Sequence, residues 1–123
     1  MTRQQFIIPG RLPGLNDYTK ANRTNAHVGA KMKRDAEDRV TLSIALNYVQ
    51  PVKKPVRVSI AWHEKDARRD PDNVSFACKF ILDALVKCGI LPDDNQANVR
   101  HISHDVLVDK AHPRIVVTLE EAS

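Results

Sequence analysis

One helix, predicted over residues 70–89, constrains the fold of this 123-residue chain more than any other segment. Asp70 is a favoured N-cap residue, and Pro71 suits the first helical position, where no amide hydrogen is needed. Gly89 suits the end of the helix, and Pro92 stops its continuation. Most residues in between are apolar: Val74, Phe76, Ala77, Cys78, Phe80, Ile81, Leu82, Ala84, Leu85, Val86 and Cys88. A helix that is apolar over so much of its circumference must be covered on two sides, by a sheet and by either another helix or a second subunit.

Hydrophobic periodicity predicts the other elements. Apolar and polar side chains alternate over residues 56–62, which indicates a strand with one buried face. Apolar residues recur every four positions from Met32 to Ile44, which predicts a helix over residues 29–49. The remaining predictions are a strand at 5–9, a Gly-, Pro- and Asn-rich loop at 10–28, and two strands, expected to be antiparallel, at 99–108 and 114–120. The order β-α-β-α-β-β predicts a single α+β domain over residues 1–123, with two helices on one face of a mixed sheet.

Carboxylates occur at both ends of the 70–89 helix. Asp70 and Asp72 lie at its start, and Asp93 and Asp94 follow its end. Clustered carboxylates hold hard divalent cations, so these residues predict a metal site if the later loop folds back to meet the earlier one. The structural alternatives are a capped helix start and an ordinary polar turn.

The same helix carries one polar stripe that contains a lysine. At 100° per residue, the stripe comprises Asp72, Ser75, Lys79, Asp83 and Lys87. In an unbroken helix Lys79 lies about 10 Å along the axis from Asp72, and helical side chains lean toward the N-terminus. The ammonium can therefore reach back to the first carboxylates, and the alternative is a pair with Asp83 one turn further on.

Basic residues border the acidic cluster and dominate the first half of the chain. Arg68 and Arg69 precede Asp70 and suit a phosphate ligand, or simply balance the neighbouring charge. Residues 1–60 carry eleven Lys and Arg against four Asp and Glu, a net +7, whereas residues 61–123 carry eight against eleven, a net −3. This asymmetry favours a protein that grips a polyanion with one surface and binds metal with another, and the alternative is a solvated basic helix face.

Several other classes of protein are disfavoured. No apolar run approaches the ~20 residues of a membrane span, and the N-terminal apolar stretch is too short for a signal peptide, so we expect a cytoplasmic protein with no membrane association. His101 and His104 face opposite sides of a predicted strand, which argues against a zinc site. No phosphate-binding glycine loop occurs, so we expect no nucleotide cofactor.

Together these motifs resemble the RusA-type Holliday junction resolvases, small endodeoxyribonucleases of bacteria and their phages. The resemblance is strongest over residues 68–96, which contain Arg-Asp-Pro-Asp-Asn, a following lysine, Leu-Asp-Ala-Leu, a glycine and Asp-Asp. It extends to residues 12–18, Leu-Pro-Gly-Leu-Asn-Asp-Tyr, which resemble the family's loop after the first strand. The seven-residue step from Asp72 to Lys79 is longer than in the family's most compact members.

The resemblance implies catalytic, metal-binding carboxylates at Asp70, Asp72 and Asp94, with Asp93 as the alternative third ligand, and an essential lysine at Lys79. It also implies Mg²⁺, for which Mn²⁺ can substitute, and a homodimer that binds a four-way DNA junction. The other expected DNA contacts are Arg68, Arg69, Lys65, Asn73, Lys20, Arg23, Lys31, Lys33 and Arg34.

The expected function is therefore metal-dependent cleavage of two opposed strands of a Holliday junction, in DNA recombination and repair. One alternative is a non-catalytic DNA-binding protein that keeps the fold. Another is a metal-dependent phosphohydrolase that acts on nucleotides.

Overall fold

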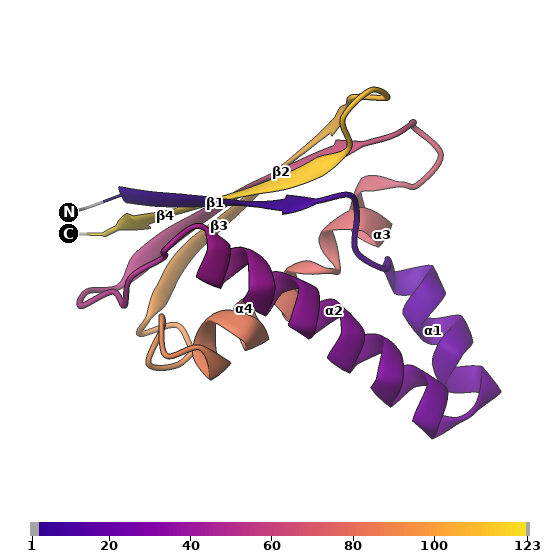
Figure 1. Cartoon of the computed structure of the whole chain (residues 1–123), viewed down its shortest axis with the longest axis horizontal. Helices are drawn as coiled ribbons and strands as arrows, with labels where there is room; N and C mark the ends of the chain where they lie inside the picture. The colour runs from indigo at the N-terminus through magenta and orange to yellow at the C-terminus, as the bar shows by residue number, and fades with distance from the viewer. Residues whose placement is uncertain (1–2, 123) are drawn as a thin grey trace.

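The computed structural model describes residues 3–122, which form a four-stranded sheet and four helical segments. The strands are β1 (Arg3–Pro9), β2 (Val56–Glu64), β3 (Val99–Val108) and β4 (Arg114–Glu121). The helices are α1 (Leu15–Thr24), α2 (Ala26–Leu46), α3 (Pro71–Ser75) and α4 (Cys78–Lys87). All four helices lie on one face of the sheet (Figure 1). None of the helices within residues 3–122 is both long and apolar enough to cross a membrane.

The sheet is mixed, with the strand order β1-β4-β2-β3. Strand β2 is parallel to β3, whereas β4 is antiparallel to both β1 and β2. Parallel neighbours need a long crossover connection, which α3 and α4 supply. The expected α+β class is confirmed, but the last two strands do not pair with each other, because β4 lies between β1 and β2.

The core lies between the sheet and the helices. The inward side chains of β2 are Val56, Val58, Ile60 and Trp62, all at most 1% exposed, as its alternating pattern predicts. Helix α4 buries Phe80, Ile81 and Leu85, and it packs against α2 as well as the core. The second cover that its apolar surface requires is therefore α2 of the same chain.

Helix α1 lies where a loop was expected, so the prediction of a loop over residues 10–28 is wrong for most of its length. The backbone of Gly14 is extended, and its N–H donates to Asp17 Oδ2 at 2.9 Å, which stabilises the helix start. Only Ala21 is buried in this helix. Such a helix has almost no apolar stripe, and hydrophobic periodicity therefore misses it.

The predicted helix over residues 70–89 is broken into α3 and α4. Lys79 N–H bonds to Phe76 O at 3.1 Å, and Phe80 N–H bonds to Ala77 O at 3.0 Å. These bonds span three residues instead of four and tighten the chain between the two helices. The prediction of one uninterrupted helix is wrong, so Asp72 and Lys79 do not share one continuous polar stripe.

Candidate active site

The loop after β2 and the start of α3, residues 65–73, carry the acidic motif and form what we call the acidic turn. Arg69 fastens this turn to the sheet, because its Nε and Nη2 donate to the two carboxylate oxygens of Glu64 at 2.8 and 2.9 Å. The side chains of Arg69 and Glu64 are only 12% and 4% exposed. A bidentate, largely buried ion pair of this kind holds its partners in one geometry. The acidic turn is therefore fixed at the end of β2.

Arg69 also binds the loop that follows β1. Its Nη1 donates to the carbonyl of Leu12 at 3.0 Å and lies 3.7 Å from Asp17 Oδ2. All of these partners belong to the protein, so the guanidinium holds two loops together. This geometry does not support the expected role of Arg69 as a phosphate contact.

Asn73 makes a second connection between the acidic turn and the start of α1. Its Oδ1 accepts the backbone N–H of Asn16 at 2.9 Å. A methyl group on Gly14 would lie 2.5 Å from the same oxygen, so only glycine allows this close approach. The two motifs that carry the family resemblance, at residues 12–18 and 68–96, are therefore in direct contact. Asn73 is a positioning residue here, and its side-chain oxygen is not free for DNA.

Asp70 and Asp72 are both exposed on this fastened turn. Asp70 precedes α3 with an extended backbone, but its side chain makes no capping hydrogen bond. Its backbone carbonyl, not its carboxylate, accepts the Val74 N–H at 3.1 Å. Asp72 lies in the first turn of α3. The structural alternative of a carboxylate used up in capping therefore does not apply to Asp70.

A polar hollow surrounds Asp70. Its lining residues are Arg11, Asn16, Asp17, Lys65, Asp66, Arg68, Arg69, Asp70 and Asn73. Arg68 is 88% exposed at its side chain and lies 3.7 Å from Asp66. Lys65 is exposed as well. This Asp70 hollow thus combines an exposed carboxylate on a fixed backbone with exposed cations, which is the chemistry that a metal ion and a phosphate require together.

Lys79 lies in a different hollow. The residues that line this Lys79 hollow are Lys33, Glu37, Lys79, Asp83, Val86, Lys87 and Asp94. The Lys79 ammonium points forward to Asp83 Oδ1, 3.6 Å away, which matches the alternative of a pair one turn further along the helix. Asp94 shares this hollow, so the structure brings Lys79 and Asp94 together but separates both from Asp70.

A row of alternating charges crosses the Lys79 hollow from α4 to α2. Lys33 lies 3.8 Å from Asp83 and 3.9 Å from Glu37, whose side chain is only 2% exposed. Lys87 lies 2.6 Å from Glu37, and this carboxylate raises the pKa of the Lys87 amine. The lysine side chains here are 44–66% exposed. Each of the three lysines is therefore paired with a carboxylate that is buried or partly buried, while its own side chain stays accessible to solvent.

Asp94 is better placed than Asp93 to bind a ligand. Both carboxylate oxygens of Asp93 are used within its own turn, since Oδ1 accepts the Asp94 N–H at 2.8 Å and Oδ2 accepts the Asn95 amide at 3.2 Å. Among residues 3–122 no such bond is made by the Asp94 carboxylate, and Asp94 lines the Lys79 hollow. The geometry favours Asp94 as the third carboxylate of the motif.

The three expected metal ligands are not assembled within one chain. The Asp70 and Lys79 hollows share no residue. The acidic turn is bound to Glu64 at one end of β2. The loop that carries Asp94 leads to Asn98, whose carbonyl accepts the Val56 N–H at 2.8 Å at the other end of β2. These two ends are about 26 Å apart, since the strand has nine residues. Within residues 3–122, no group of three Asp, Glu, His or Cys side chains is arranged to hold a metal ion. The donor atoms suit Mg²⁺, but one chain does not bring them together.

Sequence reasoning missed the residues that fix the acidic turn, namely Glu64, Gly14, Asn16 and Asp17. Glu64 completes β2 and has no distinctive spacing from Arg69. The other three belong to the Leu-Pro-Gly-Leu-Asn-Asp run, which drew attention only through the family resemblance. Their role depends on contacts between segments 57 residues apart.

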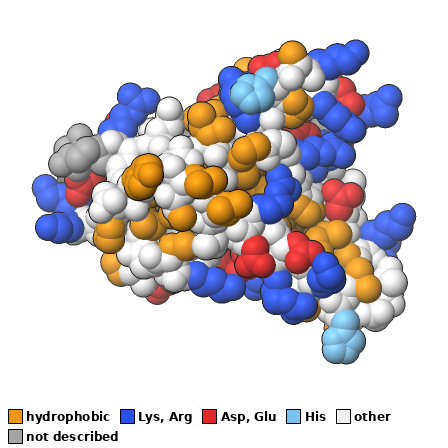
Figure 2. Space-filling model, in the orientation of Figure 1, with side chains coloured by type: hydrophobic (Ala, Val, Ile, Leu, Met, Phe, Trp, Pro, Cys, Tyr) orange, Lys and Arg blue, Asp and Glu red, His pale blue; other side chains and the backbone are white. Residues whose placement is uncertain are grey.

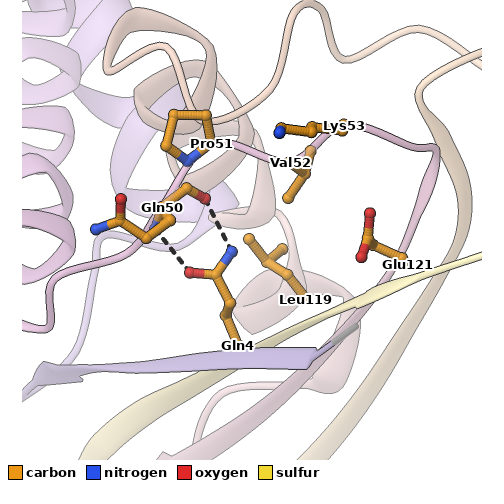
Figure 3. Close-up of a pocket in the computed structure, with 7 residues that line it drawn as sticks. All are labelled: Gln4, Gln50, Pro51, Val52, Lys53, Leu119 and Glu121. Atoms are coloured by element: carbon orange, nitrogen blue, oxygen red, sulfur yellow. Dashed lines mark hydrogen bonds between the residues drawn. The ribbon is translucent and has the colours of Figure 1, made fainter. Parts of the chain in front are cut away.

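A further hollow lies at the other end of the sheet from the acidic turn. Its lining residues are Gln4, Gln50, Pro51, Val52, Lys53, Leu119 and Glu121. Figure 3 shows that the Gln4 side chain pairs with the backbone of Gln50, donating to its carbonyl at 2.8 Å and accepting its N–H at 2.7 Å. These bonds connect the α2–β2 loop to β1. Glu121 is the one acidic residue among those that line this hollow, so the lining contains no acidic cluster.

The sequence of this chain matches one known protein family over nearly its whole length. Residues 8–120, nearly the whole chain, match the family described as Endodeoxyribonuclease RusA. No curated protein matches the chain in sequence. The matched span includes the acidic turn, both hollows and all four helices. The chain therefore belongs to the RusA family of endodeoxyribonucleases, which confirms its resemblance to the Holliday junction resolvases.

Proposed function

We propose that this protein resolves four-way DNA junctions by metal-dependent hydrolysis of phosphodiesters in two opposed strands. The observation that carries the proposal is the acidic turn, which presents Asp70 and Asp72 to solvent on a backbone fixed by Arg69 and Asn73. Exposed carboxylates two residues apart on such a turn offer the oxygen ligands that a hard divalent cation prefers. The flanking Lys65 and Arg68 supply the positive charge that a DNA backbone needs.

The proposed metal ligands are Asp70, Asp72 and Asp94, with Mg²⁺ as the ion and Mn²⁺ as a substitute. When bound, such an ion lowers the pKa of a coordinated water and stabilises the oxygen that leaves. Lys79 would stabilise the charge that develops on the scissile phosphate, because its ammonium is solvent-accessible and lies in the hollow of Asp94. Lys65 and Arg68 would hold the neighbouring phosphates in place.

A second subunit offers a way to complete the site. Because Asp70 and Asp94 line separate hollows of one chain, we infer a homodimer in which one subunit contributes Asp70 and Asp72 and the partner's Asp94 closes the ligand set. A two-fold dimer then contains two equivalent sites. The four-way junction is also two-fold symmetric, so two such sites can cut opposed strands as a pair.

Incubation with labelled four-way junctions, duplexes and single strands, with and without Mg²⁺ or Mn²⁺, tests this function. The expected result is symmetrical cleavage of the junction alone, and only when metal is present. Junction binding without cleavage under any condition would instead identify a non-catalytic DNA-binding protein. Hydrolysis of free nucleotides without junction cleavage would identify a nucleotide phosphohydrolase, and either result overturns the proposal.

A further inference from the structure

Helix α1 and the first half of α2 form a hairpin that extends beyond the sheet. Among the first ten residues of α2 only Gly29 is buried, whereas the second half buries Ala36, Val40 and Ile44 in the core. Helix α1 buries only Ala21. Figure 1 shows this hairpin at the end of the molecule away from the termini. We call residues 15–35 the arm.

The arm carries most of the net charge of the protein. It contains five basic and two acidic residues, a net +3 of the chain's +4. Lys31 is paired with Asp35 at 2.7 Å, but within residues 3–122 no ion pair involves Lys20, Arg23 or Arg34. In Figure 2, Lys and Arg side chains lie along the lower edge and on the right-hand edge above the projecting end where the two helices meet. These cations are available to an external polyanion.

The arm is also built to keep its shape. A side chain at Gly29 would overlap the Asn22 side-chain oxygen, so the two helices touch at this point. Asn25 alone connects the helices, and its Oδ1 caps α2 by accepting the Val28 N–H at 3.0 Å. At its base, the Asn16 N–H bonds to Asn73 in the acidic turn. The tip of the arm therefore lies at a set distance from Asp70 and Asp72.

We propose that this arm is a rigid second contact for duplex DNA, which grips phosphates at a fixed distance from the acidic turn. The inference rests on the proposed function and extends it to the flanking duplex. Helix α1 has ten residues and spans about 15 Å, which corresponds to roughly four base pairs along DNA. The arm thus sets how much duplex beyond the scissile phosphate the protein recognises.

The test compares two doubly neutralised variants with equal loss of charge. Lys20→Gln/Arg23→Gln removes cations from the tip of the arm, and Lys53→Gln/Lys54→Gln removes two exposed cations from the α2–β2 connection at the other end of the sheet. Both are made with Asp72→Asn, and binding to a labelled four-way junction is measured without divalent metal over a range of salt. For the tip variant, the slope of log Kd against log salt concentration should decrease by about two. Its affinity at 0.1 M salt should fall at least about tenfold. The control pair should stay within about threefold.

Shortening the duplex branches of the junction one base pair at a time tests whether the arm contacts DNA at a fixed distance from the acidic turn. The parent protein should lose affinity when the outermost ~4 base pairs of its footprint are removed, and the tip variant should not respond to them. Equal losses in the tip and control variants, or identical trimming curves, would overturn the inference. Because binding is measured without cleavage, this outcome is separate from failure of the proposed function, which is defined by intact protein that does not cut junctions in metal.

Discussion

The Asp70 hollow and the Lys79 hollow are two parts of one candidate site, but they are built in opposite ways. The first is fixed by hydrogen bonds of 2.8–3.0 Å from Arg69 and to Asn73, and the Arg69 and Glu64 side chains are largely buried. In the second, Lys33 and Lys79 lie 3.6–3.9 Å from their carboxylates and are 44–60% exposed at their side chains, and only Lys87 makes a short contact, 2.6 Å from Glu37. The first part is preorganised before any ligand arrives, whereas Lys79 in the second can leave Asp83 at little cost. In the proposed function, the acidic turn would therefore fix where cleavage takes place, and Lys79 and Asp94 would adjust to DNA or to another subunit.

Asp72→Asn should produce the largest effect on activity. An ion that loses a carboxylate ligand loses several kcal/mol of charge stabilisation, so junction cleavage should fall by about a thousandfold or more. Binding should change little, because the arm and the basic residues of the turn are intact. Single-turnover cleavage and junction affinity measured on the same preparation separate the two effects. Loss of binding together with cleavage would show that the carboxylate has a structural role.

Arg69→Met tests whether the acidic turn is the rigid half. It removes one partner of the buried pair with Glu64 and should cost about 3–5 kcal/mol of unfolding free energy. Arg68→Met, one residue earlier and 88% exposed at its side chain, is the matched control and should stay within about 0.5 kcal/mol. Denaturant unfolding measures both changes. Equal stability of the two variants would contradict the proposed fastening.

Lys79→Ala tests whether the Lys79 hollow is the adaptable half. Cleavage should fall by about a hundredfold if the ammonium stabilises the transition state. Stability should change by less than about 1 kcal/mol, because the pair with Asp83 is 3.6 Å long and its lysine is 60% exposed. The pattern expected for Lys79 is thus the reverse of that for Arg69. A large loss of stability with cleavage unchanged would contradict it.

Gly14→Ala gives the smallest expected change and tests the contact between the two family motifs. The new methyl group would lie 2.5 Å from Asn73 Oδ1 and should cost about 1–3 kcal/mol as the turn shifts. A second change, Asn73→Ala, removes this side-chain oxygen, while the Asn73 backbone oxygen, 2.9 Å from the same methyl position, remains. The cost of Gly14→Ala should then shrink in a double-mutant cycle of unfolding free energies. Costs that add independently would show that the contact does not constrain the turn.

The sheet and its main helix could be predicted because their patterns are set by burial. Strand β2 alternates from Val56 to Trp62, and α2 buries a four-residue repeat that includes Ala36, Val40 and Ile44. Helix α1 could not be found in this way, since it buries one residue. The break at Phe76 and Ala77 could not be predicted either, because both residues are apolar like their neighbours. In the structure both also retain helical dihedral angles.

The identity of the acidic residues could be predicted, but their arrangement could not. The types and spacing of Asp70, Asp72 and Asp94 are local facts of the chain. The partner of Arg69 and the hollow that Asp94 enters depend on how distant segments pack. Charge composition does not predict such contacts. Arg69 was therefore expected to bind a phosphate, although in the structure it binds Glu64. The same applies to Asn73, whose oxygen binds the start of α1.

Mixing two inactive variants tests most directly whether the Asp70 hollow of one subunit and the Lys79 hollow of its partner form one site. Asp72→Asn and Asp94→Asn chains are each expected to be inactive alone. In a mixed dimer with a shared site, one ligand set combines both substitutions and the other is intact, so nicking of a single junction strand should return. If each chain instead forms its own site, every site in the mixture carries a substitution. Continued inactivity, with mixed dimers verified by differently tagged chains, would contradict the account.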